Sequence, residues 1–127
     1  MFRIHSNPDK NRLYLTMAGH LDAPERQAVT KALMAEAAKL TPGFDVVSDI
    51  SALHATDEEG FRDILRAKSA LKLKGVGHVI RVVKIPLSRI QFDRVSKTAG
   101  YQSEQADSLE EAERRLDALR AEAGSGS

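Results

Sequence analysis

The acidic run Asp57-Glu58-Glu59, followed directly by Gly60, holds the residue types in this chain that are most able to do chemistry. Adjacent carboxylates chelate divalent cations, stabilise the N-terminus of a helix, or present negative charge to a basic partner. Thr56 precedes the run, and Thr56-Asp57-Glu58-Glu59 has the spacing of a capping box. The pattern therefore predicts that a helix begins here, with Thr56 as its cap and the two glutamates in its first turn.

Metal binding and catalysis have the least support among these uses. Asp49 together with the acidic run offers carboxylates for Mg²⁺, as in a receiver domain, but the further acidic pair and the lysine that such a site needs are not evident. His54 and Asp57 are close enough in sequence to suggest an acid–base pair, yet no serine or cysteine nucleophile stands beside them in a motif. The four histidines also lack the spacing of a metal site. We therefore predict that the protein is not an enzyme and binds neither a metal nor a cofactor.

Composition excludes several further classes. The 127 residues include 19 basic and 18 acidic side chains, a net charge of +1, whereas nucleic-acid-binding proteins usually have a basic excess. The chain has no cysteine, no signal peptide at its start, and no run of about 20 apolar residues that would span a membrane. We expect a cytoplasmic protein with one domain over residues 1–120. Residues 121–127, which end in Gly-Ser-Gly-Ser, are expected to form a flexible tail.

Alternating or β-branched apolar residues predict the strands. Leu13–Met17 alternates between apolar and other side chains, which is typical of a strand with one buried face. Residues 2–6 fit a first strand, because the turn-forming residues 7–11 would join the two as a hairpin. Three more strands are predicted: the runs Phe44–Val47 and Val79–Val83, and a polar edge strand over residues 101–106.

Capping residues and apolar stripes predict the helices. Asp22 precedes Pro24, which suits the first turn of a helix, and Ser108 forms a capping box with Glu111. Because strands alternate with helices, crossover connections and a largely parallel sheet follow. The predicted fold is a single α/β domain with a four- to five-stranded mixed, mostly parallel sheet and about four helices. The expected buried positions of the four helices are Val29, Leu33, Ala37 and Leu40; Phe61, Ile64, Leu65 and Leu71; Leu87, Ile90, Val95 and Ala99; and Ala112, Leu116 and Leu119.

Three separated motifs make the chain resemble the STAS domain, which is found in sulfate transporters and anti-sigma factor antagonists. Gly19-His20-Leu21-Asp22 resembles the G-x-L-D at the end of that family's second strand. Asp49-Ile50-Ser51 and then Asp57–Phe61 resemble the D-L-S and D-S-S-G-L segments of the family. Thr98-Ala99-Gly100, followed by Asp107–Ala112, resembles the family's closing stretch. The resemblance covers about residues 2–120, and the related antagonist-like proteins grouped with lipid-binding Sec14 domains fit the same topology.

The resemblance implies a STAS-like fold and a non-enzymatic module that docks onto a protein, often an anti-sigma factor or a kinase-like regulator. In such proteins a phosphorylatable serine precedes the motif glycine. Glu59 would stand at that serine and Glu58 at the one before it, so the usual phospho-switch is expected to be absent. The residues expected to contact the partner are Gly19, His20, Asp22, Thr56, Asp57, Glu58, Glu59 and Gly60.

Two interpretations of the glutamates remain open and are compatible. Glu58 and Glu59 either serve mainly to stabilise the helix N-terminus, by about 0.3–1 kcal/mol each, or form a permanent anionic surface. A phosphoserine carries about −1.5 to −2 charges at neutral pH, so two carboxylates approach its charge but not its geometry. Thr56 is the nearest hydroxyl and a weak alternative phosphosite, since a capping role would engage its oxygen.

Other surfaces leave further alternatives. The basic residues that follow the acidic run are expected to form a solvated helix face. A rival function is the binding of a small molecule or lipid between sheet and helices, near Phe61, Leu65, Ile90 and Phe92. A polar last strand also leaves a sheet edge through which two copies of the chain could pair as a homodimer. The basic residues in question are Arg66, Lys68, Lys72 and Lys74.

Overall fold

The computed structural model describes residues 1–54, 56–83 and 104–125 of the chain. Up to residue 83, strands and helices alternate after an initial pair of strands, as the sequence predicts. The strands are β1 (Phe2–Asn7), β2 (Arg12–Gly19), β3 (Asp45–Leu53), β4 (Val79–Val82) and β5 (Glu104–Ala106). The helices are α1 (Ala23–Ala37), α2 (Glu58–Leu73) and α4 (Leu109–Ser125).

The five strands form one mixed sheet in the order β1-β2-β3-β4-β5. β1 pairs antiparallel with β2, and every other neighbouring pair is parallel, so the α/β class and the mostly parallel sheet are confirmed. The described residues contain three helices, against about four predicted. The helix expected over residues 86–99, like the Thr98-Ala99-Gly100 motif, lies outside the described residues.

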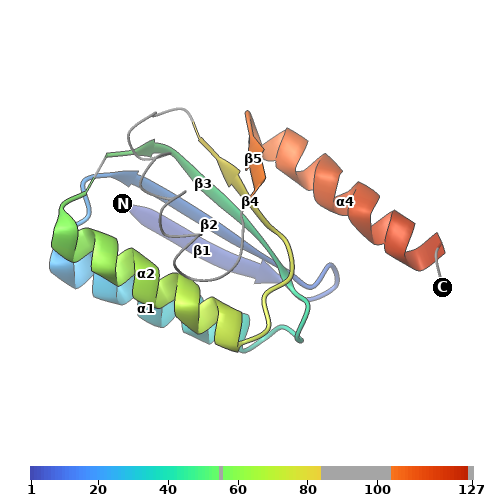
Figure 1. Ribbon diagram of the computed structural model, residues 1–127, viewed down its shortest axis with the longest axis horizontal. Helices are drawn as coiled ribbons and strands as arrows, with labels where there is room; N and C mark the ends of the chain where they lie inside the picture. The colour runs from blue at the N-terminus through green and yellow to red at the C-terminus, as the bar shows by residue number, and fades with distance from the viewer. Residues whose placement is uncertain (55, 84–103, 126–127) are drawn as a thin grey trace.

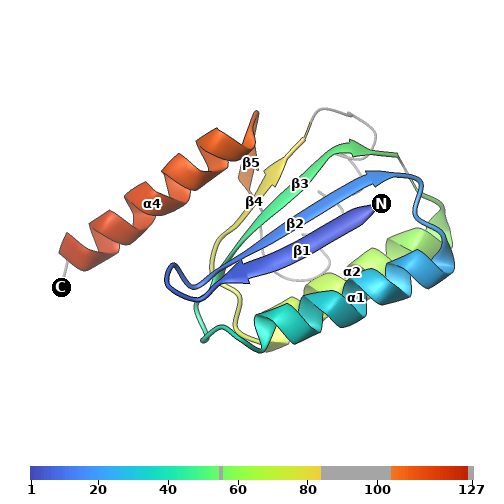
Figure 2. The same ribbon diagram turned by 180° about the vertical axis from the view of Figure 1, so that it is seen from behind.

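The helices cover the two faces of the sheet unequally. α1 and α2 lie side by side on one face, and α4 follows β5 on the other face, where Glu113 and Asp117 pair with Arg12 of β2 (Figures 1 and 2). β3 lies at the centre between the two layers, and Val47 and Ile50 on it are fully buried. Each face therefore has its own apolar core. The larger contains Leu13, Val29, Leu33, Phe44, Val46 and Leu71, and the smaller Val47, Ile80, Val82, Ala106, Ala112 and Leu116.

Local signals explain where several elements begin and end. Asn11 closes the β1–β2 hairpin with a φ of 50°, a left-handed conformation that asparagine tolerates better than most residues. At α4, the Glu111 N–H donates to Ser108 Oγ over 3.1 Å, which confirms the predicted cap. α4 continues to Ser125, past residue 120, so the division into a domain and a flexible tail stays a prediction. None of the helices within the described ranges has the length and apolar character needed to cross a bilayer.

Candidate functional site

The two loops predicted to form a docking surface meet at one edge of the sheet. β2 and β3 are parallel, so their carboxyl ends point the same way, and the His54 N–H donates to Gly19 O over 3.0 Å. Gly19 has a φ of +71°, a conformation that disfavours any side chain. We call the segments Gly19–Asp22 and Thr56–Gly60 together the junction surface. In open sheets with parallel strands, this edge is where binding sites are usually found.

Asp22 and Asp57 fix the two helices that start at the junction surface. Asp22 accepts a hydrogen bond from the Glu25 N–H over 2.9 Å, so its predicted capping role at α1 is confirmed. Asp57 does the same at α2 and accepts from the Gly60 N–H over 2.9 Å. That hydrogen bond, helped by the charges of Arg26 and His20, lowers the pKa of Asp57.

The prediction that Thr56 caps α2 is wrong. Both Thr56 and Asp57 can supply a capping oxygen, and the helix begins one residue later than the capping box implied, with Asp57 as its cap. Thr56 instead packs against Gly60. A Cβ at residue 60 would overlap Thr56 Oγ1 and lie 2.9 Å from Thr56 Cβ, so this close approach requires glycine.

Glu58 and Glu59 are exposed in the first turn of α2, as the sequence predicts. The side chain of Glu59 is 66% exposed, and its Oε1 lies 3.9 Å from Arg26 Nη2. At that distance and exposure the pair adds little stability. The carboxylates therefore remain available to a partner.

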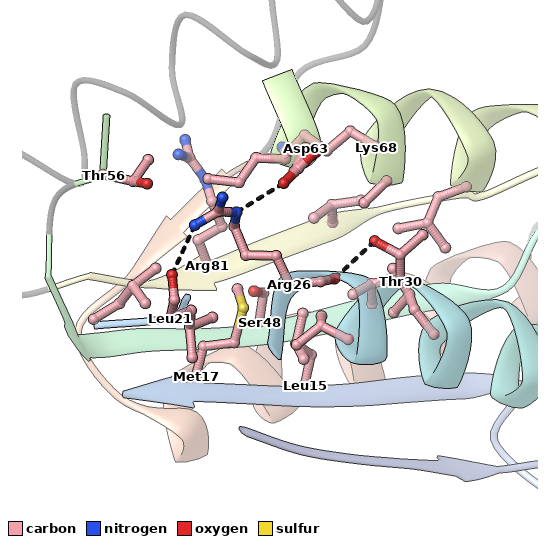
Figure 3. Close-up of a pocket in the computed structure, with 18 of the residues that line it drawn as sticks. Leu15, Met17, Leu21, Arg26, Thr30, Ser48, Thr56, Asp63, Lys68 and Arg81 are labelled. Carbon is pink, nitrogen blue, oxygen red and sulfur yellow. Dashed lines mark hydrogen bonds and ion pairs between the residues drawn. The ribbon is translucent and has the colours of Figure 1, made fainter. Parts of the chain in front are cut away.

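Arg26 on α1 connects the junction surface to the interior, and sequence analysis did not find it. Its Nε donates to Asp63 Oδ2 over 2.7 Å, and its Nη1 donates to the Leu21 carbonyl over 2.8 Å (Figure 3). The hydrogen bond to Asp63 outweighs partial burial and raises the pKa of Arg26, and the charges of Asp57 and Glu59 act in the same direction. No spacing in the sequence links Arg26 to Asp63, because the contact joins two different helices.

A cavity of about 80 Å³ lies beneath the junction surface, between the sheet and helices α1 and α2. His20 and Thr56 of the junction surface line it, together with Arg26 and Asp63. Apolar side chains make up most of the remaining lining that the structure describes: Leu15, Met17, Leu21, Val29, Leu33, Val46, Leu53, Ile64, Ala67, Leu71 and Val79.

The cavity corrects one sequence prediction and leaves another untested. Lys68 does not belong to a solvated basic face, because it is only 7% exposed and lines the cavity with Arg81 of β4, which is 1% exposed. Phe61 and Leu65, two of the residues named for a ligand pocket, are not among the described lining residues, so the position predicted for that pocket stays untested. Ile90 and Phe92 lie outside the described residues. Arg66, Lys72 and Lys74 are exposed, as expected.

The carboxylates weighed as a magnesium site do not converge. Asp49 accepts hydrogen bonds from its own neighbour, from the Ser51 N–H over 3.0 Å and from Ser51 Oγ over 2.6 Å. In the described ranges, no group of three histidine, aspartate or glutamate side chains is placed to hold a metal ion.

Solved structures with the same architecture show what kind of fold this is. Phosphorylated SpoIIAA, a Bacillus cell fate determinant, matches with a TM-score of 0.63 and 16% identity over 91% of this chain and 99% of its own. An anti-sigma factor antagonist from Mycobacterium paratuberculosis matches with a TM-score of 0.62 and 18% identity, over 92% of this chain and 93% of its own. An uncharacterised DUF3478-family protein with a SpoIIAA-like fold, from Shewanella loihica, matches with a TM-score of 0.68 and 19% identity, over 91% of this chain and 92% of its own.

The chain has a STAS-like fold. No family model matches the sequence, and no curated protein matches it. At these identities the structural likeness shows the STAS-like fold alone, so activity and partners have to be argued from the junction surface itself.

Proposed function

We propose that this STAS-like chain is a non-enzymatic, cytoplasmic regulatory module that captures a protein partner through its junction surface. The observation that carries the proposal is the exposure of Glu58 and Glu59 where two strand ends and two helix starts converge. Asp57 adds a third carboxylate, whose pKa is lowered chiefly by the hydrogen bond from the Gly60 N–H. A basic patch on the partner would complement this surface, and electrostatic complementarity of this kind sets specificity and the association rate.

An anti-sigma factor or a kinase-like regulator is the proposed class of partner. The proposal draws on the Mycobacterium paratuberculosis antagonist, which has the same fold. Position 59 holds glutamate, which has no hydroxyl, so we propose that the protein is permanently in a negatively charged state at this point. Incubation with candidate kinases followed by phosphopeptide mapping should find no phosphate on residues 56–60, and phosphate on Thr56 would contradict this.

Charge reversal at the glutamates tests the docking surface. We expect Glu58→Lys with Glu59→Lys to lose most of the capture of a partner from native lysate, with a change in melting temperature no larger than that of the control. Glu110→Lys is the matched control, because Glu110 is also an exposed acid in the first turn of a helix, but on the other face of the sheet. If the control loses the same capture, or the double variant loses none, the partner docks elsewhere.

The cavity supports a second candidate function, the binding of a small molecule. Its volume of about 80 Å³ exceeds the roughly 10–15 Å³ that one water needs, but it is well below the 300–1,000 Å³ of pockets that bury drug-sized ligands. A ligand of a few non-hydrogen atoms fits these dimensions better than a long lipid chain. Native mass spectrometry of the purified protein tests this function, and a retained small ligand is the expected result.

A further inference from the structure

We propose that the cavity is a site for a small monocarboxylate with a short apolar tail, which rests on the second candidate function and names its ligand class. The tail would lie against the apolar wall formed by β2 and α1, where Leu15, Val29 and Leu33 contribute side chains. These three residues are buried, so a tail placed there leaves water completely.

Two polar side chains, Ser48 and Arg81, line the cavity from neighbouring strands of the sheet. Leu15 of β2 pairs with Ser48 of β3, and Ser48 pairs with Arg81 of β4, so the three side chains lie in a row on the same face. Ser48 is 6% exposed, and it is one of the residues that line the cavity. A serine hydroxyl can donate a hydrogen bond, so this position can contribute a donor to an acceptor atom of a ligand.

The charges around the polar end favour an anion. Among the described residues, three cationic side chains line the cavity, Arg26, Lys68 and Arg81, against one carboxylate, that of Asp63 (Figure 3). Arg26 is paired with Asp63, and Lys68 and Arg81 also make other interactions. The inference therefore rests on the net positive charge of the lining and not on a vacant donor. In a low-dielectric site such as this, a compensating negative charge is strongly favoured.

The size of the cavity and the residue types that line it narrow the proposed anion to a short carboxylate. A carboxylate supplies one negative charge, which compensates part of the excess positive charge of the described lining. A second charged group would lie against the apolar wall at a large desolvation cost, which disfavours a dicarboxylate. The volume of about 80 Å³ limits the tail to a few carbons, so pentanoate is a suitable probe.

Amide chemical shifts measured during a titration of the ¹⁵N-labelled protein with pentanoate test the proposal. We expect saturable shifts at residues that line the cavity, among them Ser48, Ala67 and Arg81. Pentan-1-ol has the same tail without charge, and acetate has the charge without the tail, so each should bind about tenfold more weakly or worse. Decanoate, which stands for a fatty acid from lipid, should bind no more tightly than pentanoate.

Two variants test whether pentanoate binds in the cavity. Lys68→Met keeps the length of the side chain but removes its charge, and it should weaken pentanoate about tenfold while leaving pentan-1-ol unchanged. Lys72→Met is the matched control, because Lys72 is exposed one turn later on α2, and its affinity for pentanoate should equal that of the unmodified chain. Ala67→Leu fills the cavity and should abolish binding of both probes.

The outcomes separate this inference from the functions on which it depends. If pentan-1-ol binds as tightly as pentanoate, the cavity still binds small molecules and the carboxylate assignment is overturned. If neither probe shifts the cavity residues, both the ligand class and the second candidate function are overturned. Partner capture through Glu58 and Glu59 is measured separately and does not depend on either result.

Discussion

Arg12 and Arg26 each form an ion pair with a helix, and the two pairs differ in their surroundings. Arg12 of β2 is 0% exposed, and its Nη1 lies 3.2 Å from Glu113 Oε2 and 3.0 Å from Asp117 Oδ1 on α4. Arg26 also pairs with a helix, at Asp63, but it borders the cavity on one side and the exposed Glu59 on the other. Function is therefore expected where the ion pair is open to a ligand or partner.

The Arg12 cluster, which consists of Arg12, Lys10, Glu113 and Asp117, is closed by its own members. Lys10 Nζ lies 3.3 Å from Glu113 Oε2, so the same carboxylate neutralises two cations. Burial opposes the charge on Arg12, but its hydrogen bonds to Asp117 and Glu113 outweigh this and raise its pKa. None of these four residues is among the described residues that line the cavity beneath the junction surface, so we interpret the cluster as structural.

The largest effect is expected from removing the acids of the Arg12 cluster. Glu113→Gln with Asp117→Asn leaves a fully buried guanidinium without a counter-charge, and we expect a loss of about 3 kcal/mol or more in the free energy of unfolding, measured by urea denaturation. Arg12→Met should cost less, because Nε and Nη2 of Arg12 are already buried without a hydrogen-bond partner within the described residues. A larger loss for Arg12→Met than for the double variant would contradict the interpretation that the two acids mainly neutralise the buried guanidinium.

A smaller effect is expected at the open arginine. Arg26→Gln removes hydrogen bonds to Asp63 and to the Leu21 carbonyl, and we expect a loss of about 2 kcal/mol in the free energy of unfolding. Asp63 retains Arg66, whose Nη1 lies 3.2 Å from Asp63 Oδ1, so part of the cost is offset. Urea denaturation measures the loss, and a value above that of the double variant in the Arg12 cluster would reverse the comparison.

Adding a methyl group at Gly60, which lies close to Thr56, should lower the free energy of unfolding by about 1–2 kcal/mol. Gly60→Ala adds that methyl against Thr56, and the better helix propensity of alanine offsets the clash by only about 1 kcal/mol. In a Thr56→Gly background the same substitution should be neutral or stabilising. A double-mutant cycle from thermal unfolding measures the coupling, and additive effects would show that the two residues are not in contact.

The effect that is smallest near neutral pH is a dependence of stability on alkaline pH, on the α4 side. Burial, together with a hydrogen bond to Glu113 and its charge, raises the pKa of Tyr14 to about 12. In the unfolded chain tyrosine ionises at about pH 10. Between these values the unfolded state releases the proton first, so stability should fall as pH rises from about 10 to 12. Tyr14→Phe should lack this part of the pH profile in urea denaturation, and identical profiles would contradict it.

The sequence predicted the elements well, because capping and alternation are local signals. Asp22 and Ser108 cap the helices expected of them. Thr56 and Asp57 are adjacent residues that both fit a cap, so sequence alone does not choose between them. Lys68 shows a missed signal: it lies four residues after Ile64 and three before Leu71, on the apolar stripe of α2, and its charge concealed its burial.

The site was predicted only in part, because its interior depends on long-range packing. Sequence motifs placed Glu58 and Glu59 at an exposed helix start, which the structure confirms. The contact between Arg26 and Asp63 joins residues 37 positions apart, and a cavity is a volume left between elements. Neither the contact nor the cavity produces a periodic pattern in the sequence.

Hydrogen–deuterium exchange of the captured partner complex tests the docking surface most directly. We predict slower exchange over Gly19–Asp22 and over residues 56–62 when the partner is bound, with little change over α4 and the β1–β2 hairpin. Protection confined to α4 or to the hairpin at Lys10, with no change at Glu58 and Glu59, would contradict the proposal that the junction surface captures the partner.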